Sequence, residues 1–243
     1  MSRSLSLITI ALLPIILPQG IYVKKKTPRL AEAKGERVGV LGSGDTLSLL
    51  ILGDSAAAGV GVENQQSALL GALLAKLSNV FCTTYWLNAQ TGRTTQQLMT
   101  SVEHMLDRPV DVIVTSIGVN DVTQLYSPLK WIKLQRKLYE RIQQKFQPKL
   151  IVVTAVPPMH LFPALPKPLS TLFGRYSTQM NEELSKFVAT QPNMVLVDFD
   201  MALYQREGLE MAEDGFHPSE EIYKIWAGVI SENIKLRLQK VKS

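Results

Sequence analysis

Residues 111–118 read DVIVTSIG, a run of apolar and β-branched residues that ends at a glycine. Such a run predicts a strand that is buried on both faces of a sheet. Similar runs lie at 47–52, 81–87, 150–155 and 194–197. Between and after them, apolar residues recur at helical spacing in the segments 64–77, 94–106, 125–146, 170–190 and 219–238. Because strands that alternate with helices form parallel βαβ units, we expect an α/β fold, a three-layer α/β/α sandwich with a central parallel sheet of about five strands.

Composition narrows the class of protein. The chain has 243 residues, of which 46% are hydrophobic and 19% are charged, which excludes a disordered or low-complexity protein. The single cysteine, Cys82, excludes an internal disulfide framework, and the three histidines argue against a dedicated zinc site. We therefore expect no metal and no cofactor.

The net charge of +5 comes from the amino-terminal segment. Residues 1–40 hold seven of the 26 basic residues and two of the 21 acidic residues, which leaves nineteen of each in the remainder. Binding to DNA or RNA needs a basic face on the globular part, and the globular part here is neutral. We expect no nucleic-acid partner.

Residues 5–23 read LSLITIALLPIILPQGIYV, and Lys24, Lys25 and Lys26 follow directly. A membrane-spanning helix needs about 20 apolar residues, so the segment 1–26 fits a membrane anchor. A cleaved signal peptide and an amphipathic arm on a soluble domain are the alternatives, although the A-x-A site at 31–33 lies beyond the lysines. Because basic residues on the carboxyl side of a span favour the inner leaflet, we expect a cytoplasmic catalytic domain, with a periplasmic or secreted one as the alternative.

Residues 27–46 are polar and rich in glycine, and they show no sustained periodicity. These features are typical of a linker. The expected organisation is an anchor or signal-like segment at 1–26, a linker at 27–46 and one globular domain at 47–243.

Polar residues follow the predicted strands at their carboxyl ends, where α/β sheets bind ligands. Ser55 follows the first strand in GDSAAAG, at a predicted strand-to-helix turn. Gly92 follows the second strand, and Asn120 follows the third in GVND. A backbone N–H and an Asn amide are donors suited to a developing oxyanion. Each residue also has an ordinary interpretation, as a helix cap or a turn residue.

Asp214 and His217 lie three residues apart in DGFHP, just before the last predicted helix. At this spacing the carboxylate can orient the imidazole and leave the other ring nitrogen free to act as a general base. His104, on a predicted helix, and His160, in a proline-rich loop, lack such a partner, and we interpret both as structural.

Taken together, these blocks resemble the SGNH hydrolases, also called the GDSL esterase/lipase superfamily. The matching blocks are Gly53-Asp54-Ser55, Gly92, Gly118–Asp121 and Asp214–His217, and the resemblance covers residues 47–235. The first block departs from the common pattern, because it reads GDSAAAG where many members have GDSLT or GDSIT. The resemblance implies a flavodoxin-like sandwich and a serine hydrolase that cleaves acyl esters or thioesters.

The resemblance also implies the roles of the site residues. Ser55 would be the nucleophile, His217 its base and Asp214 the residue that orients His217. The backbone N–H groups of Ser55 and Gly92 and the side chain of Asn120 would form the oxyanion hole. The triad needs neither metal nor cofactor.

The stretch 157–169 reads PPMHLFPALPKPL and holds five of the 13 prolines. Prolines keep such a loop out of helix and central strand, and long loops are often functional. We expect a wall or lid over an acyl chain, with a packed connector as the alternative. The predicted substrate-binding residues are Asp54, Phe162 and Leu165. Asp54 is also expected, like Asp121, to bond neighbouring loop amides.

The leading hypothesis is a membrane-associated serine esterase that acts on an acyl ester or thioester, for example a lysophospholipid-like amphiphile, and is held to the membrane by residues 5–23. One alternative is an acyltransferase or deacetylase that works on cell-envelope glycan with the same triad. Another is a non-catalytic binding module on the same fold.

Overall fold

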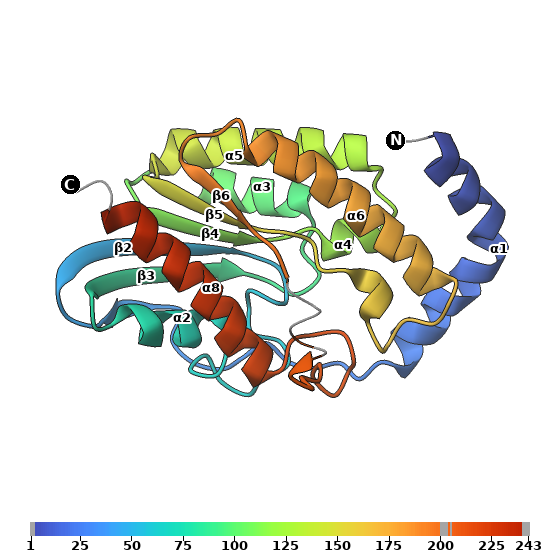
Figure 1. The fold of residues 1–243 in the computed structure, drawn as a ribbon, viewed down its shortest axis with the longest axis horizontal. Coiled ribbons are helices and arrows are strands. Elements are labelled where there is room, and N and C mark those ends of the chain that lie inside the picture. The colour runs from blue at the N-terminus through green and yellow to red at the C-terminus, as the bar shows by residue number, and fades with distance from the viewer. Residues whose placement is uncertain (1–2, 200–203, 205, 240–243) are drawn as a thin grey trace.

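The computed structural model describes residues 3–199, 204 and 206–239 and shows one six-stranded sheet (Figure 1). The ends of the predicted segments 1–26 and 47–243 therefore lie outside the described residues. The strand order is β1-β3-β2-β4-β5-β6, and every neighbouring pair is parallel except β1 with β3. The strands are β1 (Val38–Leu41), β2 (Asp45–Gly53), β3 (Phe81–Ala89), β4 (Val112–Ser116), β5 (Leu150–Thr154) and β6 (Met194–Val197).

Helices cover both faces of the sheet, which confirms the predicted three-layer sandwich. One face carries α2 (Leu69–Leu77) and α8 (Glu220–Gln239), and the other carries α3 (Thr95–His104), α5 (Pro128–Phe146) and α6 (Leu169–Val188). The remaining helical elements are α1 (Arg3–Lys26), α4 (Val119–Thr123) and the short 3₁₀ helix η1 (Met159–Leu161).

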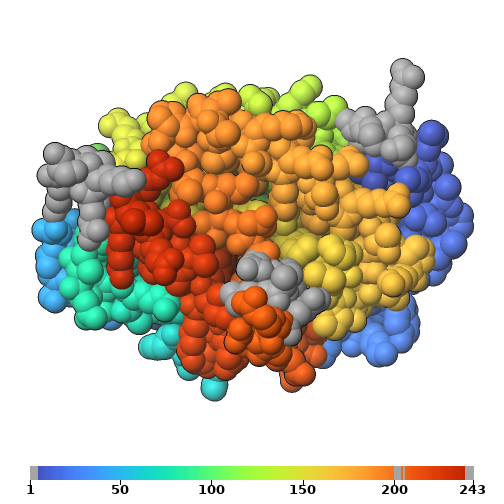
Figure 2. Space-filling view, viewed as in Figure 1, coloured from blue at the N-terminus to red at the C-terminus, as the bar shows by residue number. Residues whose placement is uncertain are grey.

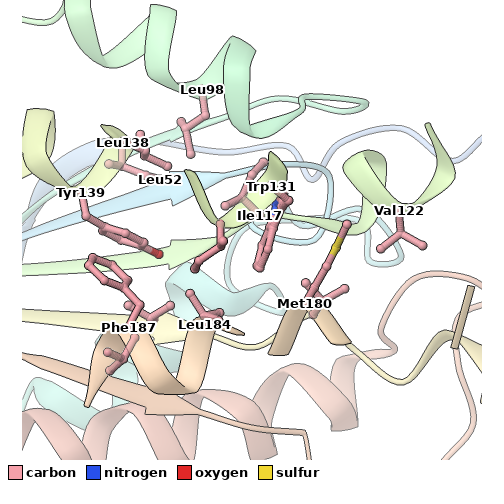
Figure 3. Packing of buried hydrophobic residues seen from close by; sticks show 14 of the residues in the cluster. Leu52, Leu98, Ile117, Val122, Trp131, Leu138, Tyr139, Met180, Leu184 and Phe187 are labelled. Atoms are coloured by element: carbon pink, nitrogen blue, oxygen red, sulfur yellow. The ribbon is translucent and has the colours of Figure 1, made fainter. Parts of the chain in front are cut away.

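The larger hydrophobic core lies between the sheet and the α3, α5 and α6 layer (Figure 3). All five residues of β4 and all five of β5 are buried, because both are central strands with helices on both sides. Tyr139 of α5 packs against Phe187 of α6 with ring centroids 5.9 Å apart. Its hydroxyl lies 2.8 Å from Thr115 Oγ1, so the polar tip of this buried ring has a partner.

The segment 27–46, expected as a linker, contributes structure to the sheet. Residues 38–41 form β1, which pairs antiparallel with β3 from Val38 opposite Trp86 to Leu41 opposite Thr83. Three of the four β1 side chains are exposed, so this edge strand carries no alternation of buried and exposed residues in its sequence. The expected sheet of about five parallel strands therefore gains a sixth, antiparallel strand at one edge.

The register of the three neighbouring strands brings the predicted site loops to one level. Gly53 at the end of β2 pairs with Ala89 of β3 on one side and with Ser116 of β4 on the other. Ser55, Gly92 and Asn120 follow these three residues by two to four positions. Since parallel strands end at the same edge, the three loops start side by side.

Helix α1 packs against α6 at one end of the molecule (Figures 1 and 2). Leu5 and Ile16 are buried there, and Thr9 Oγ1 lies 3.0 Å from the hydroxyl of Tyr176. Gln19 donates to the carbonyl of Lys167 at 2.8 Å, and its side-chain oxygen accepts from the Leu169 N–H. The amino-terminal helix therefore makes both apolar and polar contacts with α6 and the segment just before it.

Much of the remaining surface of α1 is apolar and exposed. Its exposed large side chains are Leu7, Ile10, Ile15, Leu17, Ile21 and Tyr22. The stretch Leu5–Lys26 reaches a mean hydropathy of 1.9 and is long enough to cross a membrane. A membrane anchor and a signal sequence both have these properties.

Candidate active site

Ser55 lies just beyond the end of β2, in a turn that only small residues permit. A Cβ at Gly53 would lie 2.3 Å from the carbonyl oxygen of Ser116, so glycine is required where β2 meets β4. The Asp54 N–H donates to the same carbonyl at 3.1 Å. The predicted helix does not begin directly behind Ser55: residues 55–60 form turns, and α2 begins at Leu69. The glycine at 59 has a φ of +85°, a left-handed conformation that ends a right-handed helical turn.

Tyr223 of α8 holds this turn through its hydroxyl group. Its hydroxyl lies 2.9 Å from the carbonyl oxygen of Ala56 and 2.7 Å from that of Val60, and its side chain is fully buried. The two carbonyls belong to the loop that carries Ser55, so the last helix fixes the position of the serine.

The structure brings Ser55, His217 and Asp214 into one hydrogen-bonded chain. Ser55 Oγ lies 2.8 Å from His217 Nε2, and His217 Nδ1 lies 2.5 Å from Asp214 Oδ2. The other oxygen of Asp214 accepts the backbone N–H groups of Phe216 and His217, each at 2.9 Å. The carboxylate is therefore held rigidly against the ring, as the Asp-x-x-His spacing predicts.

The protonation of this chain follows from Asp214. Burial alone would raise its pKa, but the hydrogen bonds from the side chain and backbone of His217 outweigh burial and lower the pKa of Asp214 below its ordinary value. An ionised carboxylate only accepts hydrogen bonds, so Nδ1 carries the proton and donates to it. In the neutral ring Nε2 is then the acceptor, and it faces the Ser55 hydroxyl.

Gly92 and Asn120 lie in the loops after β3 and β4. Gly92 has a φ of +80°, and a Cβ there would meet open space, so its conformation and not crowding favours glycine. Asn120 donates from Nδ2 to the carbonyl oxygen of Arg93 at 3.0 Å, which joins the two loops. The Arg93 guanidinium donates in turn to Asn88 Oδ1 at 2.7 Å.

The segment before β1 supports the Gly92 loop. Glu32 accepts the backbone N–H of Thr91 at 2.6 Å and pairs with Arg37 at 2.7 Å. Burial opposes ionisation of Glu32, but the hydrogen bonds from Thr91 and Arg37 outweigh it and lower its pKa. Arg37 also donates to the carbonyl of Ala89 at the end of β3. The predicted linker thus fixes the start of this site loop, at Ala89 and Thr91.

Two buried carboxyl groups flank the triad. Asp54 is 2% exposed, and burial raises its pKa to about 7, against a hydrogen bond from the Ala56 N–H. Asp121 is also buried, and burial raises its pKa to about 6, although the Thr95 N–H and hydroxyl donate to it at 3.0 Å and 2.9 Å. Asp54 bonds an amide of its own loop, as predicted from the sequence, whereas Asp121 bonds the first residue of α3.

Two hollows meet at the triad. A closed pocket is lined by Ser55, Asp54 and Phe162, and an open groove is lined by Asp214 and Leu165. Phe162 and Leu165 come from the proline-rich stretch 157–169, which therefore borders both hollows. Phe162 packs edge-on against Phe216 with centroids 5.0 Å apart.

The remaining side chains that could bind a metal, His104, His160 and Cys82, are not part of the hydrogen-bonded triad. His104 is at the end of α3 and contacts the carbonyl of Thr100, and His160 lies in η1 against Gly174. Cys82 is a free thiol in β3. Among the described residues, no group of three or more His, Cys, Asp or Glu side chains is placed to hold a metal ion.

The model of the GDSL-like lipase/acylhydrolase family matches residues 51–225, well over half of the chain. The chain belongs to this family. No curated protein matches the sequence. The family match confirms the resemblance and makes the protein a member of a family of ester hydrolases.

Solved structures of this hydrolase family share the fold at low identity. A member of the G-D-S-L family from Veillonella parvula is 19% identical with a TM-score of 0.61, over 76% of this chain and 97% of that one. The aryl esterase of M. smegmatis is 18% identical with a TM-score of 0.58, over 78% and 98% of the two chains. A carbohydrate acetylesterase from Sinorhizobium meliloti is 17% identical with a TM-score of 0.58, over 78% and 99%.

Three residues that hold the site of this GDSL-family hydrolase together could not be identified from the sequence: Tyr223, Arg93 and Glu32. Tyr223 looks like any core residue of an amphipathic helix, and no local pattern indicates that its hydroxyl reaches Val60. Arg93 directly follows Gly92, and a basic residue at that position is the one feature of the sequence that could have indicated its role.

Proposed function

We propose that the protein is a serine ester hydrolase in which Ser55 is the nucleophile, His217 the general base and Asp214 the group that orients and stabilises the imidazolium. The observation that carries this proposal is the unbroken chain from Ser55 Oγ through His217 to Asp214, with distances of 2.8 Å and 2.5 Å. A serine hydroxyl is a weak nucleophile near neutral pH, and an adjacent, oriented imidazole is what activates it.

The reaction proceeds in two steps. Ser55 Oγ bonds to the carbonyl carbon while His217 Nε2 takes the hydroxyl proton, and the carbonyl oxygen becomes an oxyanion. Collapse of this intermediate breaks the bond to the leaving alcohol or thiol, which takes the proton from His217. In the second step a water molecule attacks the acyl-enzyme, and His217 takes a proton from that water. The acid is released as His217 returns the proton to Ser55 Oγ.

For the oxyanion we propose the backbone N–H groups of Ser55 and Gly92 and the second amide hydrogen of Asn120. The pairing of β2 with β3 and β4 supports this set, because the three loops leave the sheet at one level. The contact between Asn120 and the Arg93 carbonyl uses one of the two Nδ2 hydrogens and leaves the other to face a ligand.

The substrate that we propose is an acyl ester or thioester of an amphiphile, reached at a membrane surface. The exposed apolar side of α1 and Lys24–Lys26 at its end support membrane contact, because apolar side chains enter the interface and lysines attract anionic headgroups. The contacts of α1 with Tyr176 and Lys167 hold the helix along the domain, which favours a helix lying on the membrane. Because anionic lipids are concentrated in the cytoplasmic leaflet, the lysines of a helix that lies on the membrane support a location on the cytoplasmic side.

Replacement of the nucleophile tests this function. Ser55→Ala is expected to lower kcat for p-nitrophenyl acetate by on the order of 10⁴-fold or more, because no hydroxyl remains to form the acyl-enzyme. The wild-type chain is expected to react with a fluorophosphonate at Ser55, as mapped by peptide mass spectrometry. Ser185→Ala, at an exposed serine of α6, is the control for the labelling. Turnover that survives in Ser55→Ala, or labelling at another serine, contradicts the assignment.

A further inference from the structure

The two hollows at the triad differ in size and shape. The closed pocket beside Ser55 has a volume of about 50 Å³, whereas the open groove has a volume of about 860 Å³. Small-molecule sites usually measure roughly 300–1,000 Å³, so only the groove has room for a long substrate group. Phe216 and His217 line both hollows, so the groove opens directly onto the catalytic ring.

The groove has two apolar walls from distant parts of the chain. The inner wall comes from the end of the proline-rich stretch and from α6, with Leu165, Leu169 and Phe173. The outer wall comes from the carboxyl half of α1, with Leu17 and Ile21. Both of these α1 side chains are 58% exposed, so each has apolar surface that no other part of the described chain covers.

Specific contacts hold α1 over the groove. Gln19 makes two hydrogen bonds to the chain around Leu169, one to the Lys167 carbonyl and one from the Leu169 N–H. Leu169 itself lines the groove, so these bonds lie beside the inner wall. Figure 2 shows α1 in dark blue as an outer layer next to the orange segment of α6. The outer wall is thus fixed to the inner wall by polar contacts, and the groove between them is mostly apolar, with Lys24, Arg29 and Thr91 also in its lining.

We propose that this groove holds the acyl chain of a long-chain ester and that α1 is its outer wall. The inference rests on the proposed function, because it places the ester carbonyl at Ser55 and the chain alongside His217. An alkyl chain fits the apolar part of the lining, which is formed by Leu17, Ile21, Leu165, Leu169 and Phe173, since burial of each methylene there is favourable. The acyl chain also stays bound through both steps of the reaction, so a groove that shelters it acts until the acid is released.

The groove predicts a dependence of activity on chain length that a matched pair of α1 variants tests. The full chain is assayed in detergent micelles with p-nitrophenyl acetate and p-nitrophenyl dodecanoate. Leu17→Asn with Ile21→Asn changes the outer wall. Leu7→Asn with Ile10→Asn makes the same changes on the same helix, at positions of similar exposure (66% and 63%) that do not line the groove.

The wall variant is expected to lower kcat/KM for the dodecanoate by on the order of tenfold, because the chain loses apolar contacts worth about two methylene groups. Acetate does not reach α1, so its kcat/KM stays within about twofold of wild type. The matched variant keeps the wild-type ratio of dodecanoate to acetate. Equal loss of dodecanoate activity in both variants overturns the inference, because it shows an effect of micelle binding alone. An unchanged ratio in the wall variant also overturns it.

A covalent probe places the chain directly. An alkyl fluorophosphonate with a diazirine at the end of a twelve-carbon chain reacts with Ser55 and is then activated by light. Crosslinks within residues 16–30 are the expected result, and crosslinks confined to the closed pocket overturn the inference. If wild-type protein neither hydrolyses an ester through Ser55 nor reacts with the phosphonate, the proposed function itself fails. Ser55-dependent acetate turnover with crosslinks outside residues 16–30 refutes the assignment of α1 as the outer wall and leaves the proposed function in place.

Discussion

A buried acid directly before the nucleophile makes a contribution to stability that is lost as pH rises. Asp54 is 2% exposed, and its Oδ1 accepts the Ala56 N–H at 3.2 Å. Burial raises its pKa from 3.8 to about 7, while that hydrogen bond and the nearby His217 oppose the rise. The folded protein therefore holds a proton at Asp54 over a range of pH in which the unfolded chain has lost it.

The sign and size of the effect follow from linkage between protonation and folding. Below about pH 4 both states are protonated at Asp54, and the site makes no difference to the free energy of unfolding. As pH rises from about 4 to about 7, only the folded state keeps the proton, so the free energy of unfolding falls. A shift of about three pKa units corresponds to about 4 kcal/mol, reached above pH 7.

Asp54→Asn removes this titration and keeps an acceptor for the Ala56 N–H. The difference in unfolding free energy between the variant and wild type is expected to grow by about 4 kcal/mol in favour of the variant between about pH 4 and pH 8. Urea denaturation followed by tryptophan fluorescence at several pH values measures it. Asp107→Asn, at a carboxylate whose side chain is 75% exposed, reports the loss of one surface charge together with its ion pair to Lys145. A difference for Asp54→Asn that is constant with pH, or that the Asp107 variant reproduces, refutes the reasoning.

Two further predictions concern the groups that serve the triad. Asn120→Ala is expected to lower kcat for p-nitrophenyl acetate by on the order of 10²–10³, because one oxyanion donor is lost; an unchanged kcat removes Asn120 from the proposed hole. Tyr223→Phe is expected to lower the free energy of unfolding in urea by about 1–3 kcal/mol, because the buried carbonyls of Ala56 and Val60 lose their donor. Wild-type stability in that variant would show that the hydroxyl does not hold the turn.

The central layers of the fold could be predicted because their signals are local. Strands buried on both faces must be apolar throughout, and the predicted strand 194–197 coincides with β6 while 150–155 differs from β5 by one residue. The helix predicted over 170–190 is α6, and its buried face repeats at helical spacing. In contrast, β1 is an edge strand with exposed side chains, so nothing in its own sequence distinguishes it from a linker.

The candidate site residues could be predicted from the sequence, but the residues that hold them in place could not. Ser55 and His217 are 162 positions apart, and motif order alone indicated that they meet. The groups that hold them are side chains of ordinary type whose partners also lie far away in the sequence: Tyr223 reaches Ala56 over 167 positions, and Glu32 reaches Thr91 over 59. Such contacts depend on how helices and strands are placed in three dimensions, and no local spacing encodes that placement.

The amino-terminal forty residues serve the site in two separable ways. Glu32 and Arg37 fix the loop of Gly92 through the Thr91 N–H and the Ala89 carbonyl, so they belong to the catalytic domain although they precede β2. Leu17 and Ile21 instead line the groove and bond to nothing in the triad. Truncation at residue 40 would remove α1, Glu32, Arg37 and three of the four residues of β1, so it would disturb the sheet as well as the site. Truncation between α1 and Glu32 removes the outer wall and keeps Glu32 and Arg37. Such a variant therefore tests the proposed binding of the acyl chain separately from the chemistry at Ser55.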